Sequence, residues 1–497
     1  MVPQDKCIYF RLDFGGVIGR GHLSRCLTMA HVFAEKGYKP ILIIRKRPST
    51  ENVILPFKVI WLKETGEAPS SCISSWRTGS EEEELHELLD VINDNSTVVL
   101  DHYGLGKHWQ AGFRKASHQL VLIQDVLSLD FESDVLINYT INSGMFFDHH
   151  RKESTTYLLG SNYTPVSPEY LAKRASFKRE NAEVNTVGIY LGGVEHKYLG
   201  TLAEALGKSK FFSAKNLEWV VNSESEKQIV LQSFPKLTVH VRLPGLLPLY
   251  ERCQLFLGAC GVATFERACL GLPQMIFSIA DNQKDTVDGL LAHKYGVYLG
   301  DVRYLSKDEV LNALETGLRT PQAENTMRFF EAIDGKGACR IVDGILAVQD
   351  PKLQIRRATH EDSEFLFDLR NQASIREMSR NSEKIEWQSH VDWYKKALSN
   401  SELCIYIGLY DNQRMGQFRI APNGDVGVSI SEAFKGKGLG TKLIVKGTMT
   451  YKESNAEKVT AVIKEVNVAS ARAFIKAGYI FVENFVEDGI KYGKYIY

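Results

Sequence analysis

The chain has 497 residues, 44% of them hydrophobic and 24% charged, and equal numbers of acidic and basic side chains give a formal net charge of zero. This length exceeds one hydrophobic core, so two or three domains are expected, and the balanced charge argues against a nucleic-acid partner bound through phosphate neutralisation. No apolar stretch reaches the length of a membrane span and the N-terminus lacks a signal-peptide pattern, so we expect a cytoplasmic protein with no membrane partner.

Strand-like and helix-like segments alternate over the first 345 residues. The predicted strands of a first series are 7–13, 39–45, 96–103, 119–125 and 135–138, and those of a second series are 186–193, 216–222, 236–242, 253–261 and 272–278. This βαβ rhythm predicts an α/β fold with two Rossmann-like lobes, over residues 1–165 and 166–346. Two such lobes in tandem suggest a cleft between them, lined by the loops at the strand ends.

The last part of the chain has a different pattern, after a boundary near 346–352. A strand is followed by an acid-rich helix start, and "DNQ" between apolar runs at 403–409 and 414–420 is a hairpin signal. A further strand, "DVGVSIS", precedes a glycine-rich loop. We therefore predict a separate α/β domain over residues 352–497.

The eight cysteines are scattered without pairing or CxxC spacing, and several lie in apolar helix-like runs. They are typical of reduced core residues. No cluster has the ligand spacing of a zinc site, so no metal is expected.

The segment "DFGGVIGRGHLSRC" places glycines and a histidine directly after the first predicted strand. Gly19 and Gly21 let the chain turn with its backbone exposed, just before helical periodicity begins. His22 at the helix start is expected to be neutral and able to take a proton from water, and Asp13 is expected to orient its ring. Taken alone, such a loop is more often a structural turn with a capping histidine.

This segment resembles the opening of the nucleotide-sugar hydrolases of pseudaminic acid biosynthesis. The residues that match the family pattern are Arg11, Asp13, Ile18, Gly19, Gly21, His22, Arg25, Cys26 and Leu27. Further similar segments follow in order, "LDHYGL", "YLLGSNY", "LGG", "IADNQ" and "DGKGACRI", so the resemblance covers about residues 5–346. It implies a fold of the glycosyltransferase (GT-B) type and removal of UDP from UDP-2,4-diacetamido-2,4,6-trideoxy-β-L-altropyranose.

The resemblance and the strand ends together predict a site for a UDP-sugar. His22 and Asp13 are the predicted catalytic residues, and the turn in "GACGVATFERACLG" is a predicted diphosphate cradle, although such a segment is equally typical of a buried strand–helix turn. The predicted UDP- and sugar-binding residues are Gly19, Gly21, Arg25, Asp101, Tyr103, Gly261, Thr264, Glu266, Asn282 and Gln283.

Three segments depart from the family pattern. The chain has Gly-Val-Ala-Thr at 261–264 where the family has Gly-Gly-Thr-Thr, and Gly-Gly-Val-Glu at 192–195 where the family has Gly-Gly-Ser-Asp. Ser167 replaces an arginine before Pro168. The change at 261–264 bears on the contacts to phosphate, and the other two bear on the identity of the sugar more than on the reaction.

The segment "EAFKGKGLGTKLIVKGTM" and the later "VNVASARAFIKAGYIFVE" resemble, in this order, the two signatures of acetyl-CoA-dependent GNAT N-acetyltransferases. The resemblance implies acetyl-CoA as co-substrate, with its pyrophosphate at the N-terminus of the helix that follows the glycines. The predicted acetyl-CoA-binding residues are Lys435, Gly436, Gly438, Gly440, Thr441, Asn467 and Ser470.

The general acid and base of this domain are left open by the sequence. Phe474 stands where many relatives have a tyrosine that protonates the leaving thiolate. Ser470, a water, Tyr492 or Tyr495 are the alternatives for the acid. The candidates for the base are His390 and Glu432.

Together the resemblances imply a bifunctional enzyme of pseudaminic acid biosynthesis, acting beside other enzymes of that pathway. It would acetylate the 4-amino group of a UDP-linked 4-amino-4,6-dideoxy sugar and then remove UDP at C1 with inversion, giving 2,4-diacetamido-2,4,6-trideoxy-L-altrose. The alternatives are a UDP-sugar-dependent glycosyltransferase, a non-catalytic nucleotide-sugar binder, and the same two reactions on another diamino-hexose.

Overall fold

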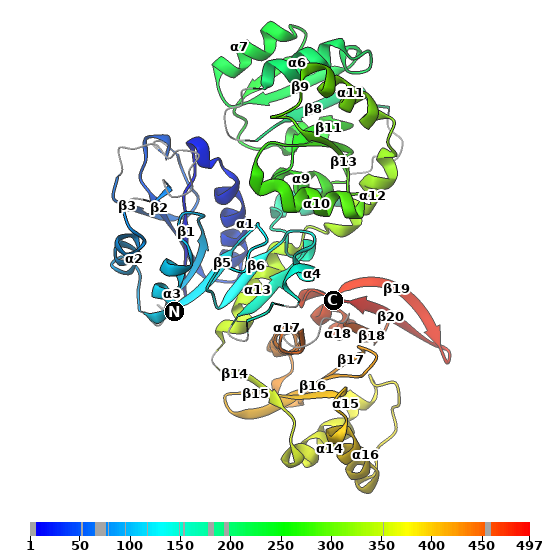
Figure 1. The fold of residues 1–497 in the computed structure, drawn as a ribbon. Coiled ribbons are helices and arrows are strands. Elements are labelled where there is room, and N and C mark those ends of the chain that lie inside the picture. The colour runs from blue at the N-terminus through cyan, green and yellow to red at the C-terminus, as the bar shows by residue number, and fades with distance from the viewer. Residues whose placement is uncertain are drawn as a thin grey trace. The chain divides into compact units, whose positions relative to one another are not determined.

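The computed structural model describes residues 6–50, 53–64, 76–77, 79–94, 96–116, 118–148, 150–152, 155–176, 183–192, 198–350, 352–452 and 459–497. Contacts divide the chain into two compact units. The first consists of Met1–Phe147 and Tyr157–Ala338, and the second of Asp148–Thr156 and Cys339–Tyr497. Each unit is an assembly of helices and strands (Figure 1).

The first sheet of the N-terminal unit has seven strands in the order β3-β2-β1-β4-β5-β6-β7. Its strands are β1 (Cys7–Leu12), β2 (Lys39–Arg45), β3 (Lys58–Leu62), β4 (Thr97–Asp101), β5 (Gln119–Ile123), β6 (Val135–Asn138) and β7 (Thr156–Leu159). Neighbours from β3 to β6 pair in parallel. Its helices are α1 (Gly21–Glu35), α2 (Glu81–Leu89), α3 (Lys107–Lys115) and α4 (Ser143–Phe147).

A second parallel sheet of the same unit has six strands in the order β10-β9-β8-β11-β12-β13. These strands are β8 (Thr186–Tyr190), β9 (Asn216–Val221), β10 (Thr238–Val241), β11 (Leu255–Ala259), β12 (Gln274–Ser278) and β13 (Val297–Asp301). The accompanying helices are α5 (Pro168–Arg174), α6 (Leu199–Lys208), α7 (Glu224–Ser233), α8 (Leu247–Arg252), α9 (Val262–Cys269), α10 (Lys284–His293), α11 (Lys307–Leu318) and α12 (Gln322–Ala332). The next helix, α13 (Gly337–Gln349), begins in this unit and belongs to the second unit from Cys339 on.

Both parallel sheets have a point at which the strand order reverses, between β1 and β4 in the first and between β8 and β11 in the second. Loops at the carboxyl ends of strands separate at such a point and leave a crevice for ligands. The two reversals therefore place the segments after β1, β4, β8 and β11 where a ligand is expected.

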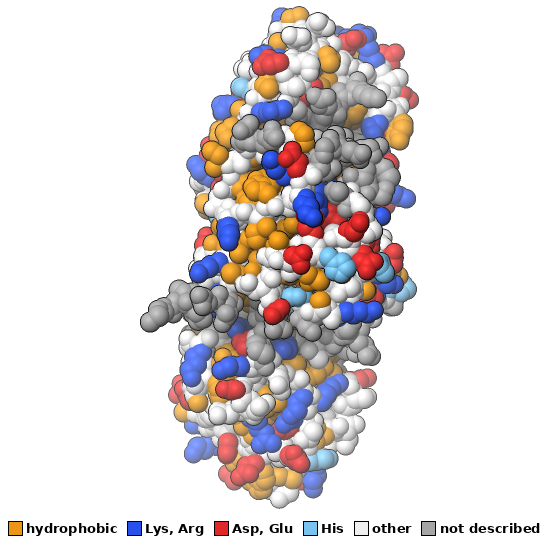
Figure 2. Space-filling view, turned by 90° about the vertical axis from the view of Figure 1, so that its left-hand side faces the viewer, with side chains coloured by type: hydrophobic (Ala, Val, Ile, Leu, Met, Phe, Trp, Pro, Cys, Tyr) orange, Lys and Arg blue, Asp and Glu red, His pale blue; other side chains and the backbone are white. Residues whose placement is uncertain are grey.

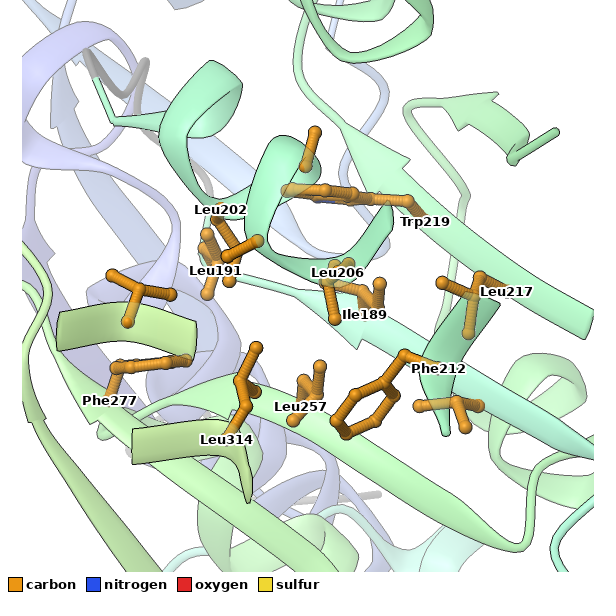
Figure 3. Packing of buried hydrophobic residues seen from close by; sticks show 14 of the residues in the cluster. Ile189, Leu191, Leu202, Leu206, Phe212, Leu217, Trp219, Leu257, Phe277 and Leu314 are labelled. Carbon is orange, nitrogen blue, oxygen red and sulfur yellow. The ribbon is translucent and has the colours of Figure 1, made fainter. Parts of the chain in front are cut away.

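The core of the second sheet shows why these sequences form parallel strands. Apolar side chains of β8, β9 and β11 pack against α6 and α11, with Trp219, Leu206 and Leu257 each at most 1% exposed (Figure 3). Strands that are covered by helices are expected to be apolar throughout, and "VGIY" and "LFLGA" have this pattern.

The C-terminal unit contains a four-stranded antiparallel sheet, in the order β14-β15-β16-β17, and a three-stranded sheet, in the order β18-β20-β19. The strands are β14 (Leu353–Arg357), β15 (Cys404–Tyr410), β16 (Gln413–Ile420), β17 (Val426–Ile430), β18 (Thr460–Lys464), β19 (Ile480–Glu487) and β20 (Ile490–Ile496). The helices are α14 (Ser363–Asn371), α15 (Ala373–Arg376), α16 (Trp387–Ser399), α17 (Leu439–Lys452) and α18 (Val468–Lys476).

An isolated bridge between Asp425 and Thr460 connects β17 to β18. The hairpin predicted around "DNQ" is confirmed, since Asp411 and Asn412 have φ values of 52° and 62° between β15 and β16.

The mixed α/β fold with Rossmann-like parallel sheets is confirmed, and every predicted strand of the two series is found. The strands β3, β7 and β13 were not predicted. Figure 2 shows basic and acidic side chains interspersed over one face, in keeping with the zero net charge. In the described ranges, no helix is both long and apolar enough to cross a membrane.

Candidate functional site

The turn after β1 sets the position of His22. Gly15, Gly16 and Gly19 have φ values of 90°, 53° and 74°, which side chains other than glycine rarely adopt. The chain then enters α1 at Gly21, so His22 is the second residue of the helix. An added Cβ on Gly21 would meet no atom within 4 Å, so the space beside this helix start is open.

His22 is held by Asp101, at the end of the neighbouring strand β4. Nδ1 of the imidazole lies 2.6 Å from Oδ1 of Asp101, whose side chain is fully buried. A buried carboxylate only accepts hydrogen bonds, so Nδ1 carries a proton, and in the neutral form of the ring Nε2 has the lone pair. Nη2 of Arg25 lies 3.1 Å from the same Nδ1 but can only donate, so while Nδ1 gives its proton to Asp101 this is a close contact and not a second hydrogen bond.

Arg25, one turn further along α1, fixes the carboxylate. Its Nε donates to Asp101 over 2.6 Å and its Nη2 over 2.5 Å, a bidentate pair, and its Nη1 donates to Asp125 after β5 over 2.5 Å. The hydroxyl oxygen of Tyr139, which follows β6, accepts a hydrogen bond from the same Nη1 of Arg25. Burial alone would raise the pKa of Asp101, but the charge of Arg25 and the hydrogen bonds from Arg25 and His22 hold it well below its usual range. Asp101 therefore remains ionised at neutral pH.

The prediction that Asp13 orients the imidazole ring is wrong. Asp13 is 1% exposed and accepts from Arg11, from Arg47 and from the backbone N–H of Arg45. It also lies 3.3 Å from Nε2 of His102. The cations beside Asp13 are Arg11 of β1 and Arg47, which follows β2, whereas Asp101 at the end of β4, the other neighbour of β1, contacts His22.

Two aromatic rings border His22. Its ring lies edge-on to Tyr103 at 4.9 Å and to Trp76 at 5.7 Å, and those two rings stack on each other. The Tyr103 hydroxyl donates to Asp125 and accepts from the side-chain amide of Asn282 over 3.2 Å. The structure thus brings together His22, Asp101, Tyr103 and Asn282.

The turn after β11 has the predicted form, but Thr264 is not exposed. Its hydroxyl donates to the Ala259 carbonyl over 2.8 Å and accepts from Arg267 over 3.0 Å. The groups that remain for an anion are the backbone N–H groups at the start of α9, which have no intrahelical acceptor. An added Cβ on Gly261 would meet no atom within 4 Å, so there is open space beside this turn.

Other predicted residues of this region differ in how they are engaged. Gln283 accepts from the backbone N–H of Ile279 over 2.8 Å and so stabilises its own loop. Ser167 and Pro168 begin α5. Gly192 has a φ of 104°, and the departures at 193–195 lie outside the described residues.

Glu266 is a buried carboxyl in α9. Burial raises its pKa to about 7, against the opposing influence of a hydrogen bond from Tyr170 and the charge of Arg267. The Tyr250 hydroxyl also donates to it, over 3.4 Å. At neutral pH this side chain is therefore divided between a form that donates a hydrogen bond and one that only accepts.

We expect Glu266→Gln to stabilise the protein progressively as the pH rises. The pKa of Glu266 is higher in the folded than in the unfolded chain. Its carboxyl group therefore does not destabilise the wild type below about pH 4.5, and it lowers the free energy of unfolding increasingly as the pH rises from there to about 7. The gain should reach about 2–3 kcal/mol at pH 8 and be small at pH 5, as measured by urea unfolding of both proteins. A difference that is equal at the two pH values would contradict this.

The glycine-rich loop of the C-terminal unit ends at the N-terminus of α17. Gly436 and Gly438 have φ values of 75° and 74°, and an added Cβ on either would meet no atom within 4 Å. The helix begins at Leu439, so Gly440 and Thr441 lie in its first turn and their N–H groups have no intrahelical acceptor. Such a turn is suited to a pyrophosphate.

Two further predicted residues belong to the start of α18. Asn467 is its N-cap, and the side-chain oxygen accepts from the backbone N–H of Ser470 over 3.2 Å. Lys435 donates to Ser374 over 2.5 Å and to Glu432 over 2.9 Å, so the start of the glycine loop is fastened to α15.

Residues 352–480 match the family described as the acetyltransferase (GNAT) domain. This part of the chain is a GNAT domain. The family description, acetyltransferase, agrees with the acetyl-CoA co-substrate that the order of the motifs predicts. No curated protein matches the chain.

Several solved structures resemble the GNAT domain. They include spermidine N-acetyltransferase from Vibrio cholerae with CoA and spermine (14% identity, 29% of this chain, 95% of that chain, TM-score 0.28). A domain from Methanocaldococcus jannaschii is 21% identical over 29% of this chain and 99% of its own, with a TM-score of 0.26. Ribosomal-protein-alanine N-acetyltransferase from Brucella melitensis is 16% identical over 29% of this chain and 98% of its own, with a TM-score of 0.26. These values are too low to indicate a shared acceptor.

The GNAT domain buries most of the side chains considered as its acid and base. Phe474 packs edge-on against Tyr479, whose hydroxyl is bonded to Thr448. Tyr492 and Tyr495 are 4% and 8% exposed.

His390 is the candidate base that the structure buries most deeply. It is 3% exposed, lies among the aromatic rings of α16, and its Nε2 is bonded to the Ser363 carbonyl. It therefore stabilises the fold. Glu432, which is exposed and bonded to Lys435 and Ser374, remains as a candidate base.

Sequence reasoning did not select Asp125, Tyr139 or Trp76. The first two follow β5 and β6, and the position at the end of a parallel strand was a signal that could have found them. Trp76 has no such signal. In the described residues, no group of three or more potential metal ligands lies together.

Proposed function

We propose that this chain carries out two consecutive reactions on one UDP-linked amino sugar. The GNAT domain acetylates the 4-amino group, and the N-terminal unit, a GT-B-type hydrolase, then releases UDP. The product is a 2,4-diacetamido-2,4,6-trideoxy-L-altrose, the sugar implied by the resemblance over residues 5–346.

In the hydrolysis, the chain supplies a base and an anion site. Nε2 of His22 takes a proton from a water molecule as its oxygen attacks C1 of the sugar. The bond from C1 to the phosphate oxygen breaks, and UDP leaves with the electron pair on the side opposite to the water, so C1 is inverted. The N–H groups at the start of α9 share the charge that develops on the diphosphate.

In the acetyl transfer, the free 4-amino group attacks the thioester carbon of acetyl-CoA. A C–N bond forms and the C–S bond breaks, the amine loses a proton, and the thiolate of CoA takes one up. The N-terminus of α17 holds the pyrophosphate of the cofactor and so fixes the thioester.

The contact between His22 and Asp101 is the observation that supports this proposal best, because a proton held on Nδ1 leaves Nε2 of the neutral imidazole able to accept one. The test is to incubate the protein with the UDP-linked 4-amino sugar and acetyl-CoA and to follow both products by NMR. Release of CoA and then of UDP with a free, inverted sugar supports the proposal. Transfer of the sugar to an acceptor hydroxyl would instead identify a glycosyltransferase.

The two reactions should be separable by one substitution in the glycine loop. Gly438→Asp adds a side chain at a φ of 74° and a negative charge at the pyrophosphate site. We expect CoA release to fall at least 100-fold, while UDP release from the already acetylated sugar stays within about 2-fold of the wild type. Equal losses of both activities would refute the assignment of the two sites.

A further inference from the structure

Four arginines lie close together in the GNAT domain, on the face of the sheet opposite α17. They are Arg370 in α14, Arg376 in α15, Arg380 after it, and Arg419 in β16. Phe418 packs against α17 at Gly447, so the alternation of β16 turns Arg419 to the other face, where α14 packs (Figure 1).

The side chain of Arg419 extends over Gly427 of the neighbouring strand. The two residues are partners in the pairing of β16 with β17, and an added Cβ on Gly427 would lie 3.5 Å from Nη2 of Arg419. The guanidinium therefore lies over β17, the strand that leads into the glycine loop at residues 435–440.

The positive charge of this group exceeds its internal compensation. Arg370 is repelled by Arg376 and Arg419, and Arg419 in turn by Arg380. The carboxylate among their electrostatic partners is Asp425, 3.6 Å from Arg380. Burial lowers the pKa of both Arg370 and Arg419.

Arg370 and Arg419 also have N–H groups without a hydrogen-bond partner among the described residues. Nη1 of Arg370 is buried without a hydrogen-bond partner, and the described residues provide no hydrogen bond to the side chain of Arg419. Arg376, by contrast, donates to the carbonyls of Asn371 and Ser382. A buried guanidinium donor without a partner, such as Nη1 of Arg370, is costly unless an anion joins it, and the planar fork of a guanidinium fits phosphate oxygens.

This group lies beside the acetyl-CoA loop. Ser374, two residues before Arg376, is bonded to Lys435 at the start of that loop. On the other side, Lys464 at the end of β18 donates to the carbonyl of Glu377 over 3.0 Å. The arginines are thus next to the place where the thioester is expected, but on the sheet face opposite the helix that receives the cofactor pyrophosphate.

We propose that Arg370 and Arg419 form an anion subsite that binds the diphosphate of the acceptor amine. The inference rests on the proposed acetyl transfer and names the class of acceptor: an amine that carries phosphate groups, as a nucleoside-diphosphate amino sugar does. A polyamine would be repelled by the same charges. CoA also has phosphates, so the test must distinguish the acceptor from the cofactor.

The test uses the full chain and the variants Arg419→Gln, Arg419→Lys and Lys395→Gln. Lys395 is an exposed cation of α16 and serves as the matched control. With the UDP-linked amino sugar as acceptor, Arg419→Gln should raise the KM of the amine 10- to 100-fold and change the KM of acetyl-CoA less than 2-fold. Arg419→Lys should recover part of the loss, and Lys395→Gln should resemble the wild type.

Inorganic pyrophosphate provides a readout that does not depend on the identity of the sugar. With the cofactor site filled by saturating CoA, pyrophosphate should still bind to the full chain, and the dissociation constant of this binding should rise at least 10-fold in Arg419→Gln. This result upholds the subsite even if the UDP-linked sugar is not a substrate. Loss of pyrophosphate binding in the presence of CoA, or an unchanged KM for a UDP-linked substrate in Arg419→Gln, would overturn it.

Discussion

His22→Ala is expected to lower the rate of UDP release by a factor of 10² to 10⁴ while UDP still binds. General-base catalysis contributes this much, and the substitution removes the imidazole without touching the turn after β11. The measurement is UDP formation under single-turnover conditions, together with the dissociation constant of UDP for both proteins.

The control for this experiment is His108→Ala, which removes an exposed histidine of α3. Its rate should equal that of the wild type. If His22→Ala retained more than a tenth of the wild-type rate, the base would have to be another group, and the assignment of His22 would fall.

Asp101→Asn is expected to have an equally large effect on turnover, for a different reason. An asparagine amide can donate to Nδ1 of His22, which then carries the lone pair, while the proton moves to Nε2. The ring keeps its place but loses its basic atom on the open side, and a factor of about 10³ to 10⁴ is expected. The quantities to measure are again the rate of UDP release and the dissociation constant of UDP.

Asp101→Asn should also destabilise the N-terminal unit. Arg25 loses a bidentate carboxylate inside the fold, and breaking a buried ion pair costs about 3–5 kcal/mol. Asp13→Asn is the informative comparison, because Asp13 is equally buried among cations but does not touch His22. Asp13→Asn should lower the free energy of unfolding, but the protein that remains folded should release UDP at the wild-type rate. Loss of turnover in Asp13→Asn alone would contradict the role given to Asp101.

The parallel strands were predictable because helices cover both sides of each sheet and leave nearly continuous apolar runs. The missed strands β3, β7 and β13 lack that signal. β3 is an edge strand of five residues, of which Lys58 and Trp61 are exposed, β7 has four residues, and Gly300 interrupts the apolar pattern of β13. In such short strands, pairing with a neighbour decides the conformation more than the side chains do.

The candidate site was predictable only in part. Asp101 and Tyr103 were predicted because they follow a parallel strand, and His22 because it follows a glycine-rich turn. Asp13 was predicted as the partner of His22, in place of Asp101, because it is closer in the sequence. Partners across a sheet depend on strand order, and the reversal between β1 and β4 is a property of the whole unit. For the same reason, Thr264 was expected to face a ligand although Ala259 and Arg267 engage its hydroxyl.

The four contacts of the Arg25 guanidinium have a consequence for the synthesis of the protein. His22 leaves the ribosome early, but Asp101, Asp125 and Tyr139 follow much later in the chain. A nascent chain that ends before β4 has no carboxylate for the imidazole, and one that ends before β5 leaves Arg25 without its second acid. The base that we propose is therefore complete only when β1, β4 and β5 have assembled, and an N-terminal fragment that ends before β5 is expected to lack it.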